Sequence, residues 1–147
     1  MGTILPIPTS VGLGVIGLAL ALSAGAIRAD VVAVVSAKSP VSALSANQVV
    51  DIFLGKSTRF PDGSQAVPID QTEGSAARDE FYLKFAGKSP AQIKAHWSKI
   101  IFTGRGQPPL EVANGADVKK RVAENPKAVG YIEQTLVDGS VKVLLVK

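Results

Sequence analysis

From residue 31 onward, apolar runs that read as strands alternate with segments whose apolar residues have helical spacing. Most of the connections between these segments are short. This alternation is typical of an α/β domain, in which helices pack on the faces of a mostly parallel or mixed sheet. The chain after residue 29 has the length of one compact lobe. We therefore predict a single three-layer α/β lobe spanning residues 30–147.

The expected elements follow from local signals. Ser45 with Gln48 and Ser89 with Gln92 have the spacing of capping boxes, so each serine marks a helix start. The first strand, predicted over residues 31–36, is a continuous apolar run, which favours a buried strand with parallel neighbours. A Gly/Pro loop is expected over residues 102–110. The remaining strands are predicted over residues 66–69, 129–132 and 141–146, and the remaining helices over 76–86 and 117–124. The aromatic residues assigned to the core are Phe53, Phe81, Phe85, Trp97 and Phe102.

The N-terminal segment contains an uncharged apolar run over residues 11–26, followed by a small residue, Ala29. This pattern predicts a secretory signal peptide over residues 1–29, cleaved after Ala29, and hence a periplasmic protein. Residues 1–10 carry no Lys or Arg, which argues against a signal peptide. The alternative is a membrane anchor over residues 11–27, although this run is shorter than the roughly 20 residues that span a bilayer.

Charge and composition exclude several classes of function. The formal net charge is +4, but the basic residues are scattered and only residues 119–121 form a cluster, so a nucleic-acid partner is not expected. Cysteine is absent, which rules out a thiol nucleophile and a disulfide framework. The single histidine and the spacing of the carboxylates suggest no metal site, no cofactor and no catalytic pair. We therefore do not expect an enzyme.

The stretch from Asp70 to Phe81 is the most informative for function, because it places a Gly-Ser turn between a predicted strand and a predicted helix. Unpaired N–H groups and the positive end of the helix dipole meet at such a turn, where a small oxyanion can bind. The Ser75 hydroxyl can either cap the helix or donate to a bound anion. Arg78 can fold back toward this turn, although its position favours solvent.

Four segments carry a resemblance to a known family. They read I-F-L-G-K over residues 52–56, V-P-I-D-Q-T-E-G-S over 67–75, F-T-G-R-G over 102–106 and N-P-K-A-V-G-Y-I over 125–132. In this order they resemble the phosphate-binding proteins of bacterial ABC transporters, within the type II periplasmic binding protein superfamily. The resemblance implies a periplasmic solute-binding role in transport and a fold like one domain of these proteins.

Two departures from the family pattern weaken the implied phosphate site. Family members have two lobes that enclose the anion, and this chain resembles mainly the second. They also usually carry Arg four residues before the capping serine and Ser-Gly-Thr at the helix start. Here Gln71 stands at the arginine position and the triplet is Ser75-Ala76-Ala77. A charged, bidentate clamp is thus replaced by a neutral amide.

The resulting expectation is an exported, non-enzymatic protein that binds phosphate or a similar small oxyanion weakly or with the help of a partner. That partner would be a second lobe, a second copy or a transporter component. The alternative is a periplasmic protein–protein interaction module that has lost anion binding. The residues expected to contact the anion are Gln71, Gly74, Ser75, Ala76, Ala77 and Arg78.

Overall fold

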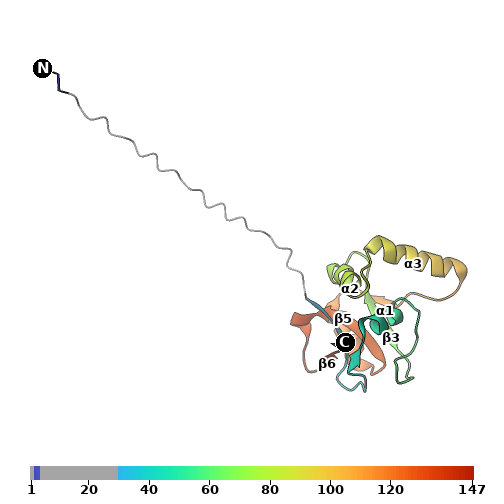
Figure 1. Ribbon diagram of the computed structural model, residues 1–147. Coiled ribbons are helices and arrows are strands. Elements are labelled where there is room, and N and C mark those ends of the chain that lie inside the picture. Colours follow the sequence, from blue (N-terminus) through green and yellow to red (C-terminus); the bar gives the residue numbers. More distant parts are fainter. Residues whose placement is uncertain (1, 4–29) are drawn as a thin grey trace.

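The computed structural model describes residues 2–3 and 30–147 (Figure 1). The predicted signal peptide and its alternative, a membrane anchor, fall on residues that lie outside this description, apart from Gly2 and Thr3. Within the described residues, no helix has both the length and the apolar character needed to cross a membrane.

A five-stranded mixed sheet forms the centre of the lobe, with the strand order β4-β3-β5-β1-β6. Strand β3 pairs in parallel with β4 and β5, whereas β1 pairs antiparallel with both β5 and β6. The prediction of a mixed α/β sheet is therefore confirmed, but the parallel neighbours expected for the first strand are wrong. The strands are β1 (Val31–Ser36), β3 (Val67–Gln71), β4 (Leu110–Val112), β5 (Ala128–Glu133) and β6 (Val141–Val143).

Two very short strands, β2 (Ala43–Leu44) and β7 (Leu145–Val146), form a separate parallel pair. The final predicted strand, residues 141–146, is thus divided between two sheets at Leu144. Strand β3 lies further along the chain than predicted, so Asp70 and Gln71 belong to the strand and not to the turn that follows it. This shift determines where their side chains point.

Three helices begin where the capping serines predict, and the fourth begins at Gly115, two residues before its predicted start. The side chains of Ser45, Ser75, Ser89 and Asn114 each accept a hydrogen bond from a backbone N–H in the first helical turn. Both predicted capping boxes are present. The helices are α1 (Ala46–Phe53), α2 (Ala76–Ala86), α3 (Pro90–Thr103) and α4 (Gly115–Glu124), with a short 3-10 helix, η1, over Gln134–Leu136.

Two apolar clusters, one on each face of the sheet, give the lobe its three layers. Along β1, Val31, Ala33 and Val35 belong to the cluster that includes α1, α2 and α3. Val34 lies between them in sequence and belongs to the cluster formed with α4. Alternate residues of a strand face opposite sides of a sheet, so β1 is buried on both faces. A strand buried on both faces is apolar at successive positions, whether the adjacent strands are parallel or antiparallel to it.

Aromatic packing fills the α1/α2 side of the sheet. The rings of Phe81 and Tyr131 are stacked, with centroids 4.1 Å apart, and Phe53 packs edge-on against Phe81. The core assignments of Phe53, Phe81 and Trp97 are confirmed. Phe85 packs against this core but is only partly buried.

The core assignment of Phe102 is wrong, because this side chain is 92% exposed. Helix α3 buries Ile93 and Trp97 and partly buries Ile100. Each step along an α-helix turns by about 100°, so the two residues after Ile100 rotate away from the core.

Candidate functional site

The predicted anion-binding turn lies between the end of β3 and the start of α2. The N–H group of Ser75 donates to the carbonyl of Thr72 over 3.1 Å, which closes the turn. Gly74 has a φ of 91°, a conformation that glycine adopts without steric cost. The N–H groups of Ala76 and Ala77 come next, and the first N–H groups of any α-helix have no partner inside the helix. The positive end of the helix dipole lies at the same position.

The Ser75 hydroxyl makes two hydrogen bonds within the protein. It accepts from the N–H of Arg78 over 3.3 Å, which caps α2, and it donates to Oε1 of Gln71 over 2.8 Å. A hydroxyl has a single proton to donate. Ser75 would therefore have to give up its bond to Gln71 before it could donate to an anion.

Gln71 points into the protein and is fully buried. Its side-chain Nε2 donates to the carbonyl of Tyr131 over 3.2 Å, while its Oε1 accepts from Ser75. Both ends of the amide are thus engaged, and Gln71 links β3 to β5 and to the start of α2. In this arrangement Gln71 supports the turn from behind.

Asp70 is a buried carboxylate that sequence reasoning did not assign to the site. It is 1% exposed and accepts hydrogen bonds from the hydroxyls of Tyr131 and Tyr82, the latter over 2.5 Å, and from the N–H of Gln71 over 2.8 Å. Burial of a carboxylate is costly unless such partners are present. Burial first, and the Asp70 charge second, raise the pKa of both tyrosines far above its ordinary value. Both hydroxyls are therefore firmly protonated donors.

The position of Arg78 in the sequence favoured a side chain that points to solvent. In the structure this side chain is only 11% exposed. Its Nε lies 3.9 Å from Oδ1 of Asp70, and its Nη1 lies 3.4 Å from Oε1 of Glu111 on β4. The guanidinium carbon lies 5.7 Å from the centre of the Tyr82 ring. Burial alone would lower the pKa of Arg78, but Asp70, Tyr82 and Glu111 outweigh it and raise that pKa. The first turn of α2 packs against the end of β3, which draws Arg78 toward these carboxylates.

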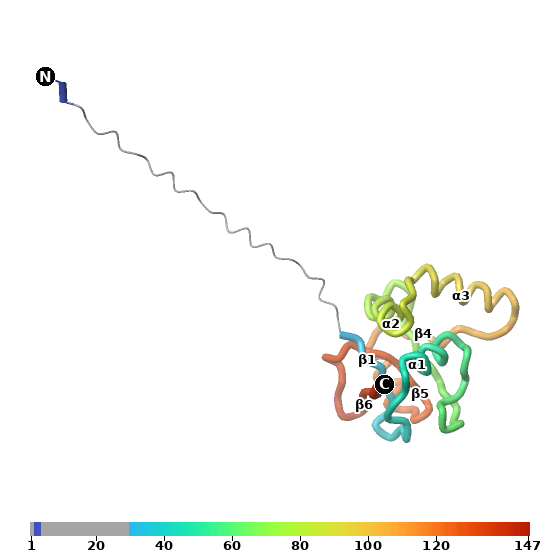
Figure 2. The backbone as a smooth tube through the Cα atoms, viewed as in Figure 1, coloured from blue at the N-terminus to red at the C-terminus, as the bar shows by residue number. Residues whose placement is uncertain are grey.

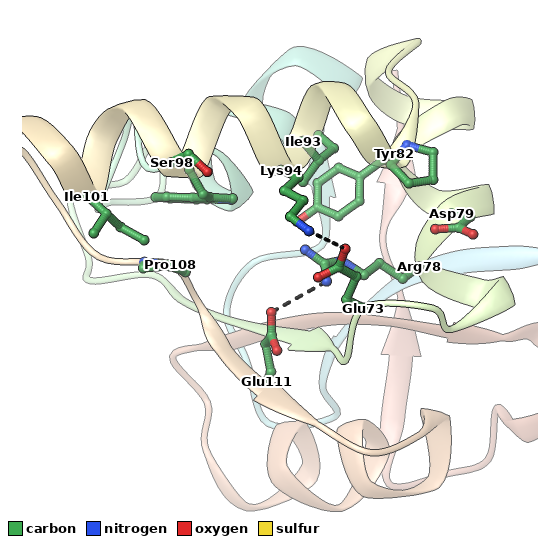
Figure 3. Close-up of a pocket in the computed structure, with 12 residues that line it drawn as sticks. Glu73, Arg78, Asp79, Tyr82, Ile93, Lys94, Ser98, Ile101, Pro108 and Glu111 are labelled. Carbon is green, nitrogen blue, oxygen red and sulfur yellow. Dashed lines mark hydrogen bonds and ion pairs between the residues drawn. The ribbon is translucent and has the colours of Figure 1, made fainter.

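A cavity of about 200 Å³ lies beside this network, between α2, α3 and the segment that leads into β4 (Figure 3). Its polar lining contains the carboxylates of Glu73, Asp79 and Glu111 together with the cations of Arg78 and Lys94. Lys94 pairs with Glu73 over 3.7 Å. The carboxylates therefore outnumber the cations, which disfavours a multiply charged anion. The apolar lining includes Trp97, whose indole N–H has no acceptor among the described residues.

Of the six residues predicted to contact an anion, Gly74 and Ala76 are exposed and Ser75 is half-buried. Gln71 and Ala77 are buried. The residues that sequence reasoning missed are the ones that organise the turn: Asp70, Tyr82, Glu111 and Tyr131. The available signal was Asp70 itself, a charged residue that directly follows an apolar run.

No protein-family model and no curated protein matches this chain. Among solved structures, the chain is similar to a phosphate ABC transporter substrate-binding protein from Clostridium perfringens that holds bound phosphate. The TM-score is 0.64 and the sequence identity 23%, over 79% of this chain and 44% of that one. It is also similar to an ABC-type phosphate transport receptor from Vibrio cholerae, with a TM-score of 0.60 and 23% identity over 78% of this chain and 44% of the receptor. PstS from Borrelia burgdorferi gives a TM-score of 0.56 at 13% identity, over 80% of this chain and 47% of PstS.

These similarities define the class of fold. The chain has the fold of one lobe of a periplasmic binding protein, with a mixed five-stranded sheet. It spans less than half the length of the solved structures that it matches. The second lobe of such proteins has no counterpart in the residues that the structure describes.

Proposed function

We propose that this chain is an exported, non-enzymatic solute-binding-like protein of the periplasm. It would bind phosphate or a similar small oxyanion weakly, or with the help of a second lobe, a second copy or a transporter component. The fold supports this proposal, because the similar structures are substrate-binding proteins of phosphate transporters. The observation that carries it is the pair of N–H groups at Ala76 and Ala77, at the start of α2 and directly after an exposed turn.

Weak binding is expected from the surroundings of this helix start. Ser75 and Arg78 already bond to Gln71, Asp70 and Glu111. An oxyanion at the turn would stay in contact with water, where the attraction between charges is small. It would also lie near carboxylates of the adjoining cavity. A partner that covers the turn would exclude water and strengthen each of these contacts.

A titration followed by amide NMR tests this site directly. Phosphate and then sulfate are added to the 15N-labelled protein, and the amide signals of Ala76 and Ala77 are expected to shift in a saturable way. The matched variant is Ala76→Pro, which removes one N–H group at the first helical position, where proline is tolerated. Ser75 has a ψ of 128°, which suits a residue that precedes proline.

The control for this variant is Ala46→Pro, the same substitution at the first position of α1, where Ser45 has a ψ of 158°. We expect the Ala46→Pro protein to keep the phosphate-dependent shift at Ala77 and the Ala76→Pro protein to lose it. Shifts that survive in Ala76→Pro, or that arise elsewhere in the chain, would count against the proposed site.

The second candidate function, a protein–protein interaction module that has lost anion binding, is favoured by the β6 end of the sheet. Strand β6 is a terminal strand of the sheet, and an open edge can accept a strand from another chain. The neighbouring side chains of Val143, Leu145 and Val146 are apolar and exposed. Light scattering after size exclusion, at several concentrations with and without phosphate, tests this candidate. A strict monomer would contradict self-association through this edge.

A further inference from the structure

The C-terminal end of helix α3 presents large apolar side chains to solvent. The helix runs along the outside of the lobe and projects beyond α2 (Figures 1 and 2). Its inner side buries Ile93 and Trp97. At its end, Ile101 is 57% exposed and Phe102 is 92% exposed. A phenylalanine this exposed at a projecting helix end gains nothing from the core, which points to contact with something outside the lobe.

The segment of the chain that contains this helix carries charges of one sign. From residue 82 to residue 109 the chain contains no Asp or Glu. Its charged residues are Lys84, Lys88, Lys94, Lys99 and Arg105. Lys84 and Lys94 have acidic partners in Asp30 and Glu73. In the described part of the chain, no carboxylate oxygen lies within 4.0 Å of the charged nitrogens of Lys99 or Arg105. Lys99 and Arg105 therefore bring unpaired positive charge close to Phe102 in the sequence. Ile101 also lines the cavity that contains Glu73 and Glu111.

Local structure holds these residues close together. Lys99 and Phe102 are three residues apart on α3, so their side chains lie on the same side of the helix. Gly104 ends the helix with a φ of 68°, and the N–H of Arg105 then donates to the carbonyl of Ile100 over 3.1 Å. This bond keeps Arg105 at the helix end. We call the group formed by Lys99, Ile101, Phe102 and Arg105 the α3 tip.

The shape and the charge of the α3 tip favour one kind of partner. Helix α3 projects from the lobe (Figures 1 and 2), and a bilayer surface can deform around a projecting side chain, whereas a protein partner would need a matching pocket. A second copy would bring like charges together when two tips meet. Basic residues that flank exposed aromatic and aliphatic side chains are typical of helices that lie at an anionic membrane interface.

We propose that the α3 tip docks this protein on an anionic phospholipid surface. Phe102 and Ile101 enter the interface between headgroups and acyl chains, and Lys99 and Arg105 contact lipid phosphates. This role is independent of the turn before α2. Docking through α3 leaves the open β6 edge available to a protein partner.

The chain contains no cysteine, so one introduced thiol can report on one position. The full chain is prepared as Phe102→Cys, labelled with an environment-sensitive fluorophore, and mixed with vesicles of phosphatidylcholine with or without phosphatidylglycerol. Leu145→Cys is the matched control, because Leu145 is also apolar and exposed and is two residues from the C-terminus, which Figure 1 marks apart from α3. The probe at residue 102 is expected to shift its emission to the blue with anionic vesicles only. The probe at residue 145 is expected not to respond.

Charge and apolar variants, measured by vesicle sedimentation of the unlabelled full chain, complete the test. Lys99→Gln combined with Arg105→Gln is expected to lower the partition coefficient roughly 10- to 30-fold, and Phe102→Ser roughly 10-fold. Leu145→Ser should leave it unchanged. Equal responses at residues 102 and 145, no response to anionic vesicles, or a lipid-free response at residue 102 that grows with protein concentration would each overturn the proposal.

Discussion

The hydroxyl of Tyr131 donates a hydrogen bond to the buried carboxylate of Asp70, 61 positions away in the sequence. The contact joins the middle of β5 to the end of β3. Tyr82 on α2 donates to the same carboxylate, and Arg78 approaches it from the first turn of that helix. One buried charge therefore fixes two strands and the start of α2, and with them the orientation of the turn that we propose as the anion site.

The buried tyrosines predict that stability falls at high pH. Burial first and Asp70 second raise the pKa of Tyr82 and Tyr131, so both stay protonated in the folded protein while the unfolded chain loses these protons near pH 10. Unfolding then releases protons and becomes more favourable as the pH rises. We expect the free energy of unfolding to fall above about pH 10, by about 1.4 kcal/mol per pH unit for each tyrosine. Urea titrations between about pH 8 and pH 11 measure this slope, and in Tyr131→Phe it should be halved.

Neutralising the buried charge predicts a large loss of stability. Asp70→Asn keeps the shape of the side chain but places an NH₂ group among hydrogen-bond donors and removes one of the two carboxylate partners of Arg78. We expect a loss of about 3 kcal/mol in the free energy of unfolding. Asp79→Asn is the control, since Asp79 lines the cavity and forms no ion pair among the described residues, and it should change stability by less than about 0.5 kcal/mol. Equal effects of the two substitutions would contradict the role assigned to Asp70.

Removing the hydroxyl of Ser75 should cost more than removing that of a simple helix cap. Ser75→Ala loses the cap on the Arg78 N–H and leaves Oε1 of the buried Gln71 without its donor. Ser89→Ala at the start of α3 loses a cap in an exposed position. In chemical denaturation, Ser89→Ala should lower the free energy of unfolding by about 1 kcal/mol, and Ser75→Ala should lower it by about 1–2 kcal/mol more. A smaller effect at Ser75 would mean that its bond to Gln71 is dispensable.

The packing of α4 on the sheet makes a further prediction. A Cβ atom added at Gly130 would lie 2.5 Å from Cγ1 of Val118 and 3.0 Å from Cγ2 of Val122. Gly130→Ala is therefore expected to lower the free energy of unfolding by about 2 kcal/mol through overpacking. Gly139→Ala, where a Cβ atom meets nothing within 4 Å, is the matched control and should have little effect. Thermal unfolding of the two variants in parallel distinguishes them.

Local signals in the sequence predicted the helices and the first strand well. Helix α2 and strand β1 have the bounds that were expected, because caps and apolar runs act within a few residues. The direction of the neighbours of β1 could not be predicted, since burial on both faces produces the same apolar run for either pairing. Strands β2, β4 and β7 are too short to leave a pattern of alternation.

The site was harder to predict than the fold. The Gly-Ser turn and the cap at Ser75 follow from residue types at fixed spacing, and both are present. The roles of Asp70, Tyr82 and Tyr131 depend on contacts between segments far apart in the sequence, which no local pattern reveals. Arg78 was expected in solvent for the same reason, because its attraction to Asp70 and Glu111 appears only when β3 and β4 lie side by side.

We propose that the lone lobe binds small oxyanions only weakly. Calorimetric titration of the purified, monomeric full chain with phosphate, and with sulfate as a comparison, tests this most directly. An exposed helix start whose hydroxyl and arginine are engaged elsewhere predicts a dissociation constant above roughly 1 mM for either anion. A dissociation constant below about 1 μM for phosphate would contradict it, because the lone lobe would then form a complete binding site without any partner.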